Sequence, residues 1–171
     1  MAFDTILVVM GVSGSGKTTV AEMLAAALGV EFLEGDKLHP RANVEKMKSG
    51  TPLTDDDRWP WLQAIAHEID TLRGQGKSAA VACSALKRAY RDVLIAARSD
   101  VVLVYLQGSQ ALIAGRLAAR KNHFMPPALL ASQFATLEEP GEDEHPVVVS
   151  IAQPPDAIVD EVVRKLEERG A

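Results

Sequence analysis

The chain has 171 residues and a mass of 18.4 kDa, which is enough for one domain with a full hydrophobic core and short for two. Hydrophobic residues make up 47% and charged residues 24% of the sequence, which argues against a disordered chain. The net charge of −5 argues against a nucleic-acid partner, because neutralising phosphates requires a basic face. The single cysteine, Cys83, excludes an internal disulfide and a cysteine-built zinc site.

Short apolar segments alternate with helical patterns along the chain, which predicts βα units around a parallel sheet in an α/β, three-layer domain. The first segment follows Asp4 rather than a basic stretch and leads into a glycine-rich loop, so we expect a strand there and not a signal peptide. No segment approaches the run of about 20 apolar residues that a membrane span needs, so we expect a cytoplasmic protein without a membrane partner. The five expected strands are 5–10, 31–33, 79–83, 101–106 and 147–151.

Helices are expected between the strands, where apolar residues recur at helical spacing. The first begins near Lys17 and stops at Gly29. Thr54 and the three acidic residues after it form an N-terminal cap for the third helix. The remaining expected helices are 40–50, 54–74, 85–98, 109–121, 128–137 and 158–166.

Two stretches interrupt the βα repeat of an expected single domain, 1–171. Residues 36–58 and 121–140 do not fit a minimal repeat, and insertions of this kind carry function in compact enzymes. We expect an acceptor-binding insertion over 36–75 and a lid over 121–140.

A phosphate-binding loop is predicted between the first strand and the first helix, where the chain matches G-x-x-x-x-G-K-[ST]. Glycines let such a loop fold back so that its backbone N–H groups point at phosphate oxygens, and the helix N-terminus adds partial positive charge. Lys17 would reach the β- and γ-phosphates, and the Thr18 hydroxyl would bind Mg²⁺. The residues expected to bind ATP are Gly11, Val12, Ser13, Gly14, Ser15, Gly16, Lys17, Thr18 and Thr19.

The reaction class follows from what accompanies this loop. The N-K-x-D segment of GTPases and the L-S-G-G-Q segment of ABC-type ATPases are both absent from the sequence. A small domain with two insertions instead favours phosphoryl transfer to a small acceptor, which must be held, oriented and shielded from water.

Asp36 is the expected orienting base. It follows the second strand at its carboxyl end, the edge where open α/β sheets bind ligands. A carboxylate there could accept the hydroxyl proton of the acceptor or hold a metal-bound water near Thr18. The alternative is a turn or cap residue before Pro40.

Basic residues are needed where charge spreads over the transferred phosphoryl group. Arg116 and Arg120 are four residues apart, hence on one helix face, and we interpret them as lid arginines that reach the phosphates. Guanidinium groups also bind carboxylates in a bidentate fork, so an anionic acceptor is expected to meet one of several further cations. These candidates, each with surface charge as the alternative, are Arg58, Lys87, Arg88 and Arg91.

Histidines give weaker signals. His39 lies near Asp36 and could contact a hydroxyl of a polyol, and His123 lies in the expected lid. Without a cluster of ligand residues, we expect no histidine-built metal site.

Further motifs extend the pattern beyond the phosphate loop. They are Gly35-Asp36 with His39-Pro40, Cys83-Ser84-Ala85-Leu86-Lys87 with Tyr90-Arg91-Asp92, and His123-Phe124-Met125-Pro126-Pro127 with Ser132-Gln133-Phe134. With these motifs, the chain resembles the gluconate kinases (gluconokinases), small P-loop kinases related in fold to shikimate and adenylate kinases. A generic P-loop kinase would share only the phosphate loop. The chain departs from the family pattern at Thr54, where Asn is usual, and at Asn122, where Gly is usual.

The resemblance implies ATP-dependent phosphorylation of D-gluconate at its terminal hydroxyl, giving 6-phosphogluconate and ADP. It also implies a dimer and an adenine-lining loop that includes Gln153. In this interpretation the primary hydroxyl meets Asp36, and other hydroxyls meet His39 and Gln133. Lys17 and Arg120 would act with Asp36 in catalysis.

Two alternatives stay open at the level of sequence. The acceptor could be shikimate or a nucleoside monophosphate, although residues 84–87 do not form the glycine-rich triplet expected for shikimate. The chain could also be a nucleotide-binding regulator without turnover, although that class is expected to lack Asp36 or the lid arginines.

Overall fold

The computed structural model describes residues 5–96, 98–119 and 127–170. Its five strands are all parallel and form one sheet in the order β2-β3-β1-β4-β5. The α/β prediction is confirmed, and each expected strand agrees with the observed one to within one residue at either end. The strands are β1 (Ile6–Met10), β2 (Glu31–Glu34), β3 (Ala79–Ala82), β4 (Val101–Gln107) and β5 (Val147–Ser150).

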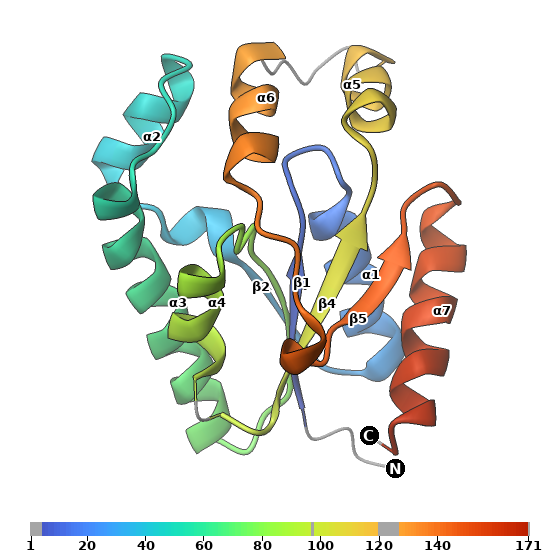
Figure 1. The fold of residues 1–171 in the computed structure, drawn as a ribbon. Coiled ribbons are helices and arrows are strands. Elements are labelled where there is room, and N and C mark those ends of the chain that lie inside the picture. The colour runs from blue at the N-terminus through green and yellow to red at the C-terminus, as the bar shows by residue number, and fades with distance from the viewer. Residues whose placement is uncertain (1–4, 97, 120–126, 171) are drawn as a thin grey trace.

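Helices cover both faces of the sheet (Figure 1). On one face α1 packs against α7, and on the other α3 packs against α4. The helices are α1 (Lys17–Leu28), α2 (Arg41–Lys48), α3 (Asp55–Gly74), α4 (Arg88–Ile95), α5 (Gln110–Ala119), α6 (Pro127–Thr136) and α7 (Pro155–Glu168), with 3₁₀ turns η1 (Gly35–Leu38) and η2 (Glu142–Glu144).

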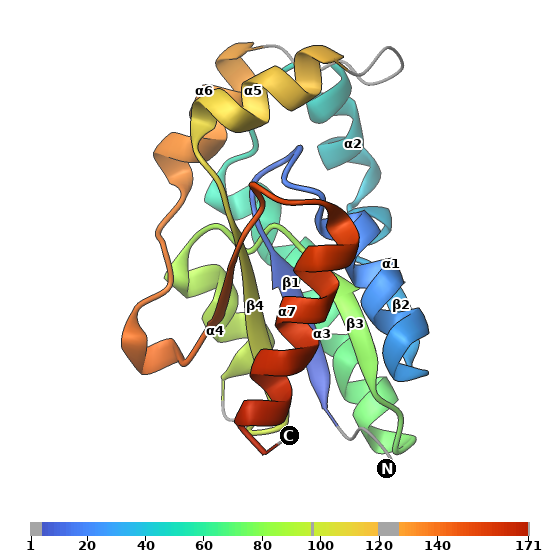
Figure 2. The ribbon, with the colours of Figure 1, turned by 90° about the vertical axis from the view of Figure 1, so that its right-hand side faces the viewer.

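The hydrophobic core lies where the central strands are sandwiched between these helices. Every residue of β1 and β3 is buried, as expected for parallel strands covered on both faces. Figure 2 shows α2, α5 and α6 above the carboxyl ends of the strands, so these three helices surround the edge where ligands bind in such sheets. No helix within the described residues has the length and apolarity to cross a membrane.

The largest difference from the predicted elements is in α4, which begins at Arg88 rather than near residue 85. Ala85 adopts a positive φ of 44° and Lys87 is extended, and neither conformation fits a right-handed helix. The segment between β3 and α4 is therefore an irregular loop at the carboxyl edge of the sheet.

Candidate active site

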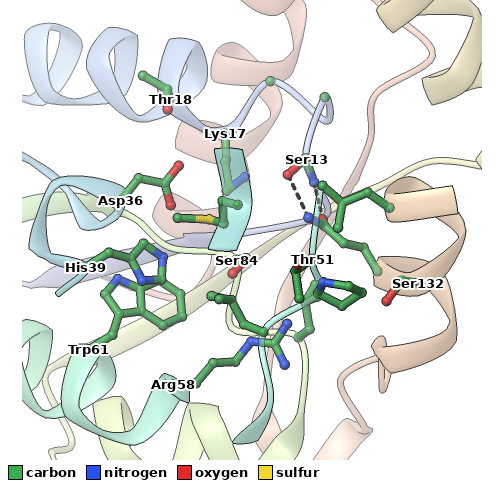
Figure 3. Close-up of a pocket in the computed structure, with 18 of the residues that line it drawn as sticks. Ser13, Lys17, Thr18, Asp36, His39, Thr51, Arg58, Trp61, Ser84 and Ser132 are labelled. Carbon is green, nitrogen blue, oxygen red and sulfur yellow. Dashed lines mark hydrogen bonds between the residues drawn. The ribbon is translucent and has the colours of Figure 1, made fainter. Parts of the chain in front are cut away.

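A cavity of about 320 Å³ lies at the carboxyl ends of the strands, between the phosphate loop and helices α2, α3 and α6 (Figure 3). Its size suits a small ligand. Lys17, Asp36 and Arg58 all line it, so three charged side chains from distant parts of the chain share one space. The polar residues in its lining are Ser13, Lys17, Thr18, Thr19, Asp36, His39, Thr51, Arg58, Ser84, Ser132 and Gln133.

The phosphate loop connects β1 to α1, as the motif predicted. Gly14 has a φ of 85°, a conformation that side-chain-bearing residues rarely adopt. A Cβ at Gly14 would also lie 2.9 Å from the Leu117 side chain. Both observations explain why glycine is needed there. Lys17 is buried at the start of α1 and lines the cavity beside Thr18.

Glu34 lies against the expected metal-binding hydroxyl. Thr18 Oγ1 donates a hydrogen bond to Glu34 Oε2 at 2.6 Å, and the backbone N–H of Asp36 donates to Glu34 Oε1 at 3.3 Å. The described residues contain no cluster of three or more His, Cys, Asp or Glu side chains that could hold a metal ion. Mg²⁺ needs less, because it is usually bound by one or two protein oxygens together with phosphates and water. The hydroxyl of Thr18 and the carboxylate of Glu34 fit that requirement.

Asp36 reaches the cavity from η1, directly after β2 (Figure 3). Gly35 makes this position possible, because a Cβ there would lie 2.4 Å from the carbonyl oxygen of Ala82. Trp61 of α3 stabilises the same turn, because its indole N–H donates a hydrogen bond to the Gly35 carbonyl at 2.8 Å.

His39 lies next to Asp36 and stacks on Trp61. The ring centroids are 4.1 Å apart and the ring planes differ by 15°. Burial lowers the pKa of His39, and the positive charge of Arg58 lowers it further, while the charge of Asp36 acts in the opposite direction. The net lowering favours a neutral imidazole at neutral pH.

Four cations were expected as candidates to bind an anionic acceptor, and the structure describes all of them. Of these four, Arg58 lines the cavity. Its Nη1 donates to the Tyr90 hydroxyl at 3.0 Å, and that hydroxyl in turn donates to a carboxylate oxygen of Asp55. Lys87 is engaged by the same carboxylate, with Nζ 3.0 Å from Asp55 Oδ1. Lys87 therefore supports the network that orients Arg58 and does not itself line the cavity.

Arg88 and Arg91 lie outside the cavity, which corrects the placement expected from sequence. Arg91 is 1% exposed, and its Nε lies 2.6 Å from Glu144 Oε1. Its Nη1 also donates to the carbonyl of Ala85. Arg88 pairs with Asp143 at 2.8 Å. These contacts connect α4 to η2. Ion pairs occupy both guanidinium groups, and that of Arg91 is buried as well.

Gln133 of α6 contacts the phosphate loop itself. The backbone N–H of Ser13 donates to Gln133 Oε1 at 2.7 Å, and Gln133 Nε2 donates to Ser13 Oγ at 2.9 Å. This reciprocal pair brings α6 against the loop, where Gln133 also lines the cavity.

Arg116 and Gln153 lie at a second cavity, of about 510 Å³, on another side of the phosphate loop. Arg116 Nη2 donates to the carbonyl of Ile151, and Gln153 Nε2 donates to the carbonyl of Ser150. Thr19 lines both cavities. The sequence-based assignments of Arg120 and His123 lie outside the described residues.

Known proteins match this chain over most of its length. A family model described as an AAA domain matches residues 6–140. A gluconokinase of Gluconobacter oxydans (strain 621H) is 52% identical over 164 residues, covering 94% of this chain and 90% of that protein. The chain belongs to the gluconokinase family. The thermoresistant gluconokinase of Escherichia coli (strain K12) is 47% identical over 95% of this chain and 94% of that protein.

Solved structures agree with this gluconokinase assignment. The crystal structure of a gluconokinase from Sinorhizobium meliloti 1021 superposes with a TM-score of 0.90 at 47% identity, covering 98% of this chain and 94% of that one. A shikimate kinase from Aquifex aeolicus vf5 has a TM-score of 0.68 at 16% identity, covering 97% and 98% of the two chains. The second likeness shows a shared fold alone.

The site contains three residues that were not expected from the sequence of this gluconokinase-family chain: Glu34, Trp61 and Asn43. Glu34 could have been found as an acidic residue at the carboxyl end of the strand that leads to Asp36, the same edge as Thr18. Trp61 has the apolar character of a core residue and is buried, and it also lines the cavity. Nothing in the sequence distinguishes Asn43, which is buried and hydrogen-bonds His39.

Proposed function

We propose that this protein transfers the γ-phosphoryl group of ATP to the terminal hydroxyl of D-gluconate, giving 6-phosphogluconate and ADP. The observation that carries the proposal is the shared cavity, which is lined by Lys17 of the phosphate loop, Asp36 of η1 and Arg58 of α3. One cavity thus has a cation for phosphate, a carboxylate for a hydroxyl and a cation for the acceptor carboxylate.

The phosphate loop and Lys17 would hold the nucleotide phosphates. Backbone N–H groups and a buried ammonium, already in position, stabilise the charge that spreads over the phosphoryl oxygens during transfer. Mg²⁺, bound through Thr18 with Glu34 beside it, would neutralise further charge on the phosphates. On the other side of the loop, Arg116 and Gln153 would contact the nucleotide, and Arg120 is proposed from its four-residue spacing to Arg116 in the sequence.

Asp36 would orient the acceptor hydroxyl and take its proton. The hydroxyl oxygen forms a bond to the γ-phosphorus, the bond from that phosphorus to the bridging oxygen of ADP breaks, and the proton passes to a carboxylate oxygen of Asp36. The in-line geometry comes from holding both reactants in one cavity.

Arg58 would bind the carboxylate at the other end of gluconate. The fork of a guanidinium group matches a carboxylate, and the Tyr90 hydroxyl already orients it. His39 and Gln133 would contact hydroxyls along the chain of the acceptor, and His123 is proposed from the family resemblance. The proposed setting is the cytoplasm, with a homodimer as the family resemblance implies.

A panel of acceptors tests this function. ATP consumption with Mg²⁺ is measured with gluconate, other sugar acids, glucose, shikimate and nucleoside monophosphates, and ³¹P NMR identifies the product. We expect turnover with gluconate and a phosphate monoester on its terminal carbon. Turnover with another acceptor alone would overturn the pocket assignment. ATP binding without turnover on any acceptor would favour the alternative of a nucleotide-binding regulator.

A further inference from the structure

Asn43 has an orientation that its surroundings determine. It is 3% exposed, and its Nδ2 donates to the backbone carbonyl of Asp57 at 2.8 Å. A carbonyl oxygen can only accept a hydrogen bond, so the amide nitrogen and not the amide oxygen must face it. The same Nδ2 lies 3.2 Å from Nδ1 of His39.

This contact decides which nitrogen of His39 carries the proton. An amide NH₂ group has two hydrogens and no lone pair to offer, so Asn43 can only donate to Nδ1. Nδ1 is then the unprotonated nitrogen, and the proton of the neutral ring is on Nε2. Among the described residues Nε2 has no hydrogen-bond partner, and His39 lines the cavity.

Several contacts hold the carbonyl group that orients Asn43. Thr54 and Asp57 form a capping box at the start of α3, and Lys46 Nζ of α2 lies 2.7 Å from Asp57 Oδ2. The carbonyl that orients Asn43 therefore belongs to a helix start that is held from both α2 and α3. Trp61 fixes the plane of the imidazole by stacking.

We propose that Asn43 is a positioning residue that holds His39 as a one-way hydrogen-bond donor, through Nε2–H, to an oxygen of the acceptor. This inference rests on the proposed function. With Nδ1 occupied and Nε2 protonated, His39 has no lone pair for the acceptor's proton, which leaves Asp36 as the base. The charged groups acting on the ring are Asp36 from η1 and Arg58 from α3.

The ring tautomer can be measured without turnover. ¹⁵N NMR of the imidazole distinguishes Nε2–H, Nδ1–H and doubly protonated rings, and the His39→Gln variant assigns the His39 signals. In the wild type at neutral pH we expect the Nε2–H tautomer, with the Nε2 signal shifting when gluconate is added. A wild-type ring protonated on Nδ1 would overturn the proposal. This measurement does not depend on whether a variant folds.

The variant Asn43→Asp tests the role in the reaction. A carboxylate accepts a hydrogen bond from Nδ1–H, so the neutral ring should carry its proton on Nδ1. Nε2 is then unprotonated and cannot donate a hydrogen bond to gluconate. The new carboxylate also raises the pKa of His39, so the comparison is made at a pH where the ring of the variant is neutral. There we expect the KM for gluconate to rise about tenfold, the loss of one hydrogen bond, with the KM for ATP unchanged. Lowering the pH should reverse much of this rise, because a doubly protonated ring donates from both nitrogens.

Lys46→Met is the matched control, because it loosens the same helix start without touching His39. It should leave the tautomer unchanged, and any change in KM should not depend on pH. Equal, pH-independent effects of the two variants would make Asn43 merely structural and overturn the proposal. If gluconate neither shifts the Nε2 signal nor is phosphorylated, the proposed function fails, and the tautomer result still stands on its own.

Discussion

The phosphate end of the cavity comes from one short stretch of chain, Gly11 to Thr18, whereas the acceptor end combines side chains from η1, α2 and α3 (Figure 3). The phosphate end consists mostly of backbone, shaped by glycines such as Gly14. The acceptor end consists of side chains that need supports, such as Tyr90 behind Arg58 and Trp61 behind His39. We therefore expect the phosphate end to depend on a few residues in contact with ligand and the acceptor end also on residues one layer away.

Asp36→Asn should have the largest effect, because it removes the base at the point where the two ends meet. We expect turnover to fall by about 10²–10⁴-fold, the range for a lost general base, with ATP binding retained. Steady-state kinetics and nucleotide titration measure the two quantities. Asp56→Asn, at an exposed position of α3, is the control. Near-normal turnover in the Asp36 variant would remove Asp36 from the mechanism.

Lys17→Met tests the phosphate end. Losing a preorganised donor to the phosphates should lower turnover by about 10²–10³-fold and weaken ATP binding, with gluconate affinity little changed. The same two assays report both effects. Lys37→Met, in the exposed part of η1, keeps the net-charge change and should behave as wild type. Unchanged ATP kinetics in the Lys17 variant would contradict the phosphate-loop assignment.

Tyr90→Phe tests the layer behind the acceptor end. The substitution removes the hydroxyl that accepts from Arg58 and donates to Asp55 while keeping the ring. The hydroxyl orients Arg58 and does not itself bind gluconate, so we expect the KM for gluconate to rise about two- to tenfold, the value of one ordinary hydrogen bond, with the KM for ATP unchanged. Equal increases for both substrates would point to a general loss of packing instead.

Asp57→Asn tests the helix start that supports α2 and α3, through stability rather than turnover. Hydrogen bonds from Lys46 and Thr54 lower the pKa of Asp57 to about 2. Because the folded-state pKa is lowered, this stabilisation is complete above the ordinary aspartate pKa and is lost as the pH falls towards 2. The Tm difference between wild type and variant should therefore be largest near neutral pH and shrink in acid. A difference that does not change with pH would contradict the assignment.

The same contrast explains what could be predicted from sequence. The phosphate loop was predictable because its chemistry is contained in eight consecutive residues. Asp36 and His39 were predictable because both follow β2 at the carboxyl edge of the sheet. Their placement in one cavity agrees with that expectation, while their roles remain proposals.

The sequence did not distinguish the cation that lines the cavity from the other candidate cations. Arg58 and Arg91 looked equivalent in sequence, yet Arg91 is buried against Glu144, which is 53 residues away in the chain. No local pattern reveals such a pairing. The orientation of Asn43 depends on the backbone carbonyl of Asp57 in another helix. Every residue has a backbone carbonyl, so the sequence does not indicate which one accepts this hydrogen bond.

The claim that Arg58 recognises the acceptor carboxylate, while Asp36 meets the hydroxyl at the other end, is tested most directly by comparing gluconate with glucitol. Glucitol keeps the hydroxyls and lacks the carboxylate, and kcat/KM is measured for both acceptors in the wild type, Arg58→Met and Arg88→Met. We predict that Arg58→Met loses a preference of about 10–100-fold for gluconate, the value of a hydrogen bond to a charged group, and that Arg88→Met retains it. A preference that survives in Arg58→Met, or disappears in Arg88→Met, would contradict the account.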